Sequence, residues 1–197
     1  MSKGEETRTA ILDEAAELAS TVGLGSLTIG TLATRTKMSK SGLYAHFDSK
    51  EGLQIDVLRR ARDRFVDVVL RPAFAAPRGR PRVEALFERW LVWQSEGFPG
   101  GCLFLDAVSE YDDQEGPVRD ELLRAERDKA EVVRTIVQTG ISEGDFAPDT
   151  DTEQFDFEME GILRAHHHSR RMMRDPDAEA RARTAFHRLL ESARPTS

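Results

Sequence analysis

Hydrogen-bond donors and cations gather in one short stretch of the chain, between Thr28 and Lys50. Hydroxyl, ammonium, phenol and imidazole groups, together with free backbone N–H groups, donate to phosphate oxygens and to the edges of bases. The stretch could therefore hold an anion. The binding candidates in it are Thr28, Ser39, Lys40, Ser41, Gly42, Tyr44, His46 and Lys50.

Two short helices are predicted to position these groups. Thr28 is a good N-cap for a helix that ends near Thr36, and Ser39 offers a second N-cap for a helix that ends near His46. Lys37 and Met38 form the turn between them. Two short helices joined by a three- or four-residue turn make a helix-turn-helix.

The second of these helices is predicted to present a small polar face. At about 100° per residue, a stripe that avoids Leu43 contains Lys40, Ser41, Tyr44 and Ala45. Leu43 and Phe47 point inward. Such a face suits a helix lying in the major groove of DNA. Gly42 costs about 1 kcal/mol of helix propensity, which close approach to a phosphate or base edge would explain.

Helix starts supply further donors. The segment Asp48-Ser49-Lys50-Glu51 predicts another helix, with Asp48 as its N-cap and Glu51 reaching back to it. Lys50 then lies in a first turn, where the helix dipole disfavours a cation. A phosphate partner would account for this lysine, and the hydroxyls of Thr28 and Ser39 face an anion in the same way.

The rest of the chain is also helical in pattern, so an all-α fold of about nine helices is expected. The first helix spans about residues 7–22 and is capped by Gly23. The helix that begins at Asp48 is predicted to end at Pro72, and the stretch 73–81 is predicted to be a loop. Later helices are expected at about 83–96, 102–111, 118–141, 155–175 and 178–190.

Composition excludes several classes of protein. The chain has 197 residues, 39% of them apolar, enough for one or two compact domains. The longest apolar run is four residues, so no membrane span is expected, and the N-terminus lacks the apolar core of a secretory signal. We therefore expect a cytoplasmic protein. The net charge of −7 disfavours nucleic acid, but residues 1–60 balance eight basic against eight acidic side chains.

The N-terminal quarter resembles the TetR family of bacterial transcriptional regulators. The resemblance covers about 50 residues and rests on ILDEAAELA, LTIGTLATRTKMSKSGLYAHF and DSKEGL. It implies a DNA-binding domain over residues 1–50 and a ligand-binding and dimerisation domain over 51–197. In the family, the residues that match Thr28, Lys40, Ser41, Gly42, Tyr44, His46 and Lys50 touch DNA. Thr36-Lys37 departs from the small residue and glycine of many members, so the resemblance does not predict the backbone geometry of this turn.

The resemblance also implies a helical pocket for a small-molecule effector. Apolar side chains would suit an amphipathic molecule, although any one of them is more often simply part of a core. The candidates are Phe65, Val69, Trp90, Trp93, Phe104, Phe155 and Met159.

Two other features have both a functional and a structural interpretation. His166-His167-His168 cannot converge on one metal ion from a helix, so we expect packing and no metal site. Cys102 follows Gly100-Gly101 at a helix start, where a thiolate is favoured. A redox sensor is therefore an alternative, but a buried inert thiol is the commoner case.

The segment FEMEGILRAHHHSRRMMRDPDAEARARTAFHRLL is similar to the last two helices of many family members, which pair in the dimer. Small residues at Ala178, Ala182 and Ala185 permit close approach of another helix. We therefore expect a homodimer that binds a near-palindromic operator in double-stranded DNA.

The expected function is that of a ligand-responsive repressor. An activator and a helical module that does not read DNA are the alternatives. The sequence has no Cys–His pair close in sequence, no phosphate-binding glycine loop and no metal-ligand spacing. We therefore expect neither an enzyme nor a cofactor.

Overall fold

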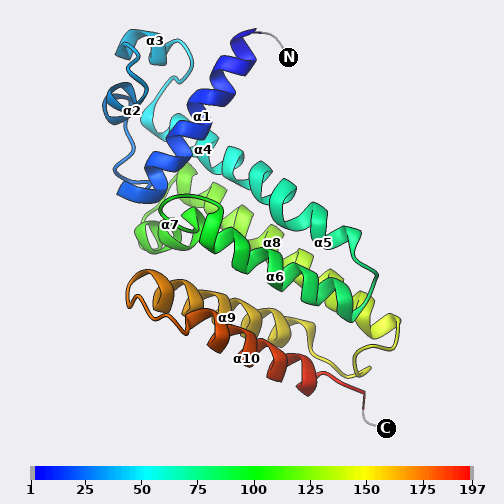
Figure 1. Cartoon of the computed structure of the whole chain (residues 1–197). Helices are drawn as coiled ribbons and strands as arrows, with labels where there is room; N and C mark the ends of the chain where they lie inside the picture. Colours follow the sequence, from blue (N-terminus) through cyan, green and yellow to red (C-terminus); the bar gives the residue numbers. More distant parts are fainter. Residues whose placement is uncertain (1–2, 196–197) are drawn as a thin grey trace. The chain divides into compact units, whose positions relative to one another are not determined.

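The computed structural model describes residues 3–195, and every regular element in that range is a helix. The elements are α1 (Lys3–Val22), α2 (Ile29–Thr36), α3 (Lys40–Tyr44), α4 (Lys50–Phe65), the π-helical turn η1 (Val66–Leu70), α5 (Arg71–Ala75), α6 (Arg80–Glu96), α7 (Leu103–Tyr111), α8 (Pro117–Ser142), α9 (Thr152–Arg171) and α10 (Ala178–Ser192). The expected all-α fold is confirmed (Figure 1).

The helix predicted to end at Pro72 and the loop predicted over 73–81 are both wrong in their bounds. The chain stays helical through η1 and α5 as far as Ala75, and α6 already begins at Arg80. Pro72 lies in the first turn of α5, where its missing N–H has no intrahelical acceptor to lose. A proline therefore starts a helical segment here instead of ending one.

The described chain divides into two compact units. Unit 1 contains the described residues up to Phe65 together with Ser95–Ala125, and unit 2 contains Val66–Gln94 and the described residues from Glu126 onward. Each unit has its own buried apolar side chains, as a compact folding unit requires.

Helix α1 organises unit 1, because α2, α4 and α7 all contact it and α3 contacts α2 (Figure 1). The loop after α1 begins at Gly23, whose φ of +88° favours glycine and whose N–H donates to the carbonyl of Ala19. This confirms Gly23 as the C-terminal cap. The fully buried leucines of the unit include Leu27, Leu32, Leu43 and Leu53.

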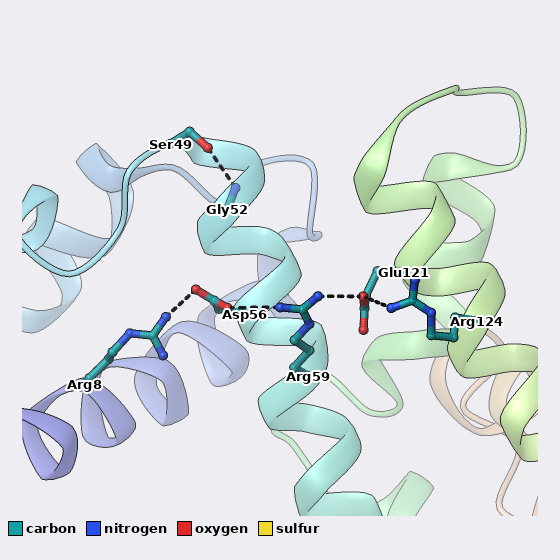
Figure 2. Close-up of polar contacts among 7 residues, drawn as sticks. All are labelled: Arg8, Ser49, Gly52, Asp56, Arg59, Glu121 and Arg124. Atoms are coloured by element: carbon teal, nitrogen blue, oxygen red, sulfur yellow. Dashed lines mark hydrogen bonds and ion pairs between the residues drawn. The ribbon is translucent and has the colours of Figure 1, made fainter.

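A chain of ion pairs joins three helices of unit 1 (Figure 2). Arg8 of α1 pairs with Asp56 of α4, and Arg59 of α4 pairs with Glu121 of α8 at 3.2 Å. Arg124 also pairs with Glu121, and Glu121 is only 5% exposed. A buried carboxylate between two guanidinium groups is satisfied, and its hydrogen bond raises the pKa of Arg59.

The cap of α4 differs from the expected one. Ser49, not Asp48, accepts from the backbone N–H of Gly52 at 2.9 Å (Figure 2). The carbonyl of Ser49 accepts from the N–H of Leu53. The serine side chain thus satisfies a free N–H of the first turn one residue later than predicted.

The turn between α2 and α3 requires an unusual backbone. Lys37 ends α2 in the left-handed conformation, with φ 57° and ψ 26°. This conformation costs a residue with a Cβ about 1–2 kcal/mol, and glycine adopts it freely. A lysine at position 37, where many family members have glycine, therefore leaves the turn intact but strained.

In unit 2, α9 and α10 lie side by side (Figure 1). The ring of Phe87 in α6 stacks on that of Phe186 in α10, with centroids 3.8 Å apart. In α9, partial burial and the neighbouring Glu160 raise the pKa of Asp156 to about 6. This carboxylate is held in an environment that disfavours its charge.

Lys37→Gly should stabilise the protein by roughly 1 kcal/mol, because it relieves the left-handed strain at the turn. Urea unfolding monitored by circular dichroism measures this. Lys37→Ala is the matched variant, since it removes the charge but keeps the Cβ. An equal gain in both variants would mean that the charge, not the backbone, is the cause.

Asp156→Asn should stabilise the protein at pH 8 but not at pH 4. The folded-state pKa of Asp156 lies above its ordinary value, so the folded state holds this proton more tightly. Stability is consequently lost as pH rises from about 4 through 6, and the asparagine variant does not lose it. Thermal unfolding at the two pH values tests this, with exposed Asp149→Asn as the control. Equal effects at both pH values would contradict it.

Candidate nucleic-acid interface

The small polar face predicted for α3 is exposed, and the two apolar side chains predicted to point inward are buried. Lys40, Ser41, Tyr44 and Ala45 are all exposed, with Tyr44 at 57%. Leu43 is 0% exposed and Phe47 is 2% exposed. The helix therefore turns its apolar side into unit 1 and leaves a small, polar and basic side to a partner.

Both helices of the motif begin with the predicted caps. Ser39 Oγ accepts from the N–H of Gly42 at 3.0 Å, and Thr28 forms a reciprocal capping box with Thr31. A hydroxyl that accepts in this way keeps its own proton for donation. A Cβ on Gly42 would lie 3.1 Å from Ser39 Oγ, so the cap itself favours glycine there.

Lys40 reaches from α3 to the start of α2. A Cβ built on Gly30 would lie 3.8 Å from Lys40 Nζ and 3.6 Å from Thr28 Oγ1. One ammonium and one hydroxyl thus flank the N-terminal turn of α2, where the backbone N–H groups also carry partial positive charge. This corner can hold a phosphate.

Lys50 has a partner that was not expected. Its Nζ donates to the carbonyl of Gly25 at 2.6 Å, so the loop before α2 provides the acceptor. Lys50 is exposed and can exchange this carbonyl for a phosphate. His46 is only half-buried, and its ring lies 6.3 Å from that of Phe47.

Two residues that hold the same loop were missed from the sequence. The Glu110 carboxylate of α7 accepts from the N–H groups of Leu24 and Gly25, at 3.0 and 2.7 Å. The buried Gln54 of α4 donates to the carbonyl of Leu24 at 2.7 Å. No local pattern marks Glu110, because its partners lie 85 and 86 residues away.

Fewer cations of the helix-turn-helix are available to a partner than the sequence suggests. Arg35 points away to α1, where it pairs with Glu14 at 3.0 Å and Glu17 at 3.5 Å. The exposed cations that remain near α3 include Lys37, Lys40 and Lys50.

The seven candidate effector residues are all buried. Phe65 and Phe104 belong to unit 1, and the other five belong to unit 2: Val69, Trp90, Trp93, Phe155 and Met159. Phe155 lines a cavity of about 240 Å³ together with residues of α10.

The histidine run contributes a buried pair. Gln94 Nε2 donates to the carbonyl of Leu163, so its Oε1 faces His166 Nδ1 at 2.5 Å and must accept the proton of that nitrogen. Burial lowers the pKa of His166, which favours the neutral ring. Its Nε2 has no hydrogen-bond partner among the described residues.

Cys102 is 2% exposed, at the start of α7. Within residues 3–195, no three His, Cys, Asp or Glu side chains come together as a metal site would require. No helix in that range is long and apolar enough to cross a bilayer.

Solved structures of similar fold are numerous. A TetR-family transcriptional regulator from Cytophaga hutchinsonii has a TM-score of 0.86 and 21% identity, and the match covers 100% of this chain and 99% of that one. A TetR regulator from Chloroflexus aurantiacus has a TM-score of 0.81 and 24% identity, with coverage of 97% and 96%. A TetR-family regulator from Streptomyces coelicolor has a TM-score of 0.78 and 22% identity, with coverage of 96% of each chain.

No curated protein matches this sequence significantly. Two family models do. The one described as bacterial regulatory proteins of the tetR family matches residues 11–57, which contain the helix-turn-helix. The one described as a tetracyclin repressor-like C-terminal domain matches residues 79–186, more than half of the chain. The chain therefore belongs to the TetR family of bacterial transcriptional regulators.

Proposed function

We propose that this regulator is a repressor that binds a near-palindromic operator as a homodimer and releases it when a small molecule binds. The observation that carries the proposal is the exposed polar face of α3 above the buried Leu43 and Phe47. A face of this size and polarity fits the major groove without displacing any apolar side chain.

The residues proposed to bind DNA fall into two classes. Lys40, Ser41, Gly42 and Tyr44 lie on or beside the exposed face of α3, where they reach base edges or the nearest phosphates. Thr28, Ser39 and Lys50 lie at helix starts, where hydroxyl, ammonium and N–H groups suit phosphates. His46, which is half-buried and follows the C-cap residue of α3, is proposed to donate from the turn after the helix.

Residues 1–50 are proposed to read DNA and residues 51–197 to regulate. The hydrogen bonds of Glu110 and Gln54 with the loop at Leu24 and Gly25 support a link between the two regions, because both side chains come from the regulatory region. An effector that moved α4 or α7 would move the loop that precedes α2. Such an effector would bind the arrangement that does not fit the operator more tightly than the arrangement that does. The ratio of these two affinities sets how far the effector lowers operator affinity.

The effector is proposed to bind inside the helical regulatory region. The seven buried aromatic and apolar candidates suit an amphipathic molecule. Two-fold pairing of α9 and α10 is proposed for the dimer. To reach two half-sites one turn of DNA apart, such a dimer would need its two copies of α3 about 34–36 Å apart.

Lys40→Ala should weaken binding to DNA from the regulator's own upstream region about tenfold or more, because each subunit then has one cation fewer at a phosphate. The slope of log affinity against log salt should fall by about 0.9 for each phosphate that is no longer neutralised. Electrophoretic shift at several salt concentrations measures both. Arg71→Ala removes the same charge from an exposed position in unit 2 and should change neither.

Tyr44→Ala should weaken specific binding while it leaves the salt slope nearly unchanged, since the phenol is uncharged at neutral pH. The same electrophoretic shift series measures the affinity and the slope. If Lys40→Ala and Tyr44→Ala both bound like the wild type, α3 would not be the reading helix.

Transcription in vitro from a promoter that contains the bound site should fall when the protein is added. The reason is that an operator-bound dimer would compete with polymerase for the same stretch of DNA. An increase in transcript would contradict repression and leave DNA binding intact.

A further inference from the structure

The turn of the helix-turn-helix holds a lysine where the backbone favours glycine. Lys37 has a φ of 57°, in the left-handed region that residues with a Cβ rarely adopt. Within residues 3–195, the only other non-glycine residue with a positive φ is Arg174. Because glycine would fit this turn without strain, the geometry of the turn does not account for a lysine here.

Contacts within the described chain do not account for the side chain of Lys37 either. The residue is exposed, and its ammonium forms no ion pair with any residue of the range 3–195. Arg35, two residues earlier, pairs with Glu14 at 3.0 Å and with Glu17 at 3.5 Å. The charge of Arg35 is thus neutralised within the chain, whereas the charge of Lys37 is available to a partner from outside.

Lysines are concentrated in this part of the chain. Only five of the 28 basic residues are lysines, and three of these are Lys37, Lys40 and Lys50. A lysine ammonium is a compact point charge on a flexible stem, which suits the oxygens of a phosphate. Lys40 and Lys50 are already proposed to meet phosphates, so Lys37 is the one lysine of the helix-turn-helix without a role.

Lys37 and Lys40 lie at opposite ends of α2. Lys40 Nζ lies 3.8 Å from a Cβ built on Gly30, in the first turn, whereas Lys37 directly follows the last residue of the helix. The eight residues of α2 make it about 12 Å long. The first helix of a helix-turn-helix crosses the DNA backbone, and the second enters the major groove. Two cations at the two ends of α2 can therefore meet different phosphates.

We propose that Lys37 binds a phosphate of the operator backbone, different from the phosphate that Lys40 contacts. The inference rests on the proposed function, because it takes α3 as the helix that lies in the major groove. The phosphate supplies the acceptor that the exposed ammonium lacks within the described chain. A glycine at position 37 would relieve the strain of the turn and lose this contact, so the lysine exchanges stability of the free protein for affinity.

Electrophoretic shift of the full chain on DNA from the regulator's own upstream region, at several salt concentrations, tests the contact. Lys37→Gly should weaken binding about tenfold and lower the slope of log affinity against log salt by about 1.8, because each of the two subunits loses one phosphate contact. Lys37→Arg keeps the charge, so its affinity and slope should stay close to those of the wild type. Urea unfolding of the same Lys37→Gly sample should show no loss of stability, which excludes misfolding as the cause of weaker binding.

Arg35→Ala is the matched control within the motif. It removes a cation two residues away, but that cation is already paired with Glu14 and Glu17, so the salt slope should not change. An equal fall in slope for Arg35→Ala would mean that the net charge of the motif, not a contact of Lys37, is responsible. Weaker binding by Lys37→Gly with an unchanged slope would assign the effect to the backbone of the turn. Either result overturns the inference.

Lys40→Ala in the same series distinguishes failure of this inference from failure of the proposed function. A lower slope for Lys40→Ala beside wild-type binding by Lys37→Gly contradicts only the role of Lys37. Wild-type binding by both variants contradicts DNA binding through the helix-turn-helix itself. The double variant should lower the slope by the sum of the two single changes, because two phosphates are involved. A double variant no worse than Lys40→Ala alone would place both lysines on one phosphate and contradict the inference.

Discussion

The burial of Leu43 and Phe47 is the interaction on which the DNA-facing surface depends. Helix α3 has only five residues, far fewer than an isolated helix needs to persist in water. Its position must therefore come from packing, and two fully buried apolar side chains contribute about 1.5–3 kcal/mol each. With them inside, the opposite side of the helix must face outward. Exposure of Lys40, Ser41 and Tyr44 is thus a consequence of what the neighbouring leucine and phenylalanine bury.

Polar side chains hold the loop before α2, which apolar packing alone does not fix. The loop before α2 is held by Glu110, Gln54 and Lys50, each of which bonds to the backbone of Leu24 or Gly25. Backbone groups in a loop need partners as much as those in a helix do. Because Glu110 and Gln54 lie outside the first 50 residues, the segment proposed to read DNA shares its stability with the rest of unit 1.

Local spacing was enough to predict most of the helices and the inward direction of Leu43. Such features depend on residues within a few positions of one another. Errors arose where two rules competed. Pro72 ends most helices but is tolerated in a first turn, and Asp48 and Ser49 are both good N-caps. Nothing local could reveal Glu110 or the carbonyl partner of Lys50, because those hydrogen bonds form only after distant segments pack.

If α3 lies in the major groove of operator DNA once in each subunit, a reagent fixed to its exposed face must cut the DNA beside it. A DNA-cleaving iron chelate attached at Ala45→Cys provides this measurement, since Ala45 is exposed on the face of α3. We expect strand cuts in two clusters about one helical turn apart on bound operator DNA. A protein that binds the operator but produces no cuts from this position would show that another surface reads the DNA.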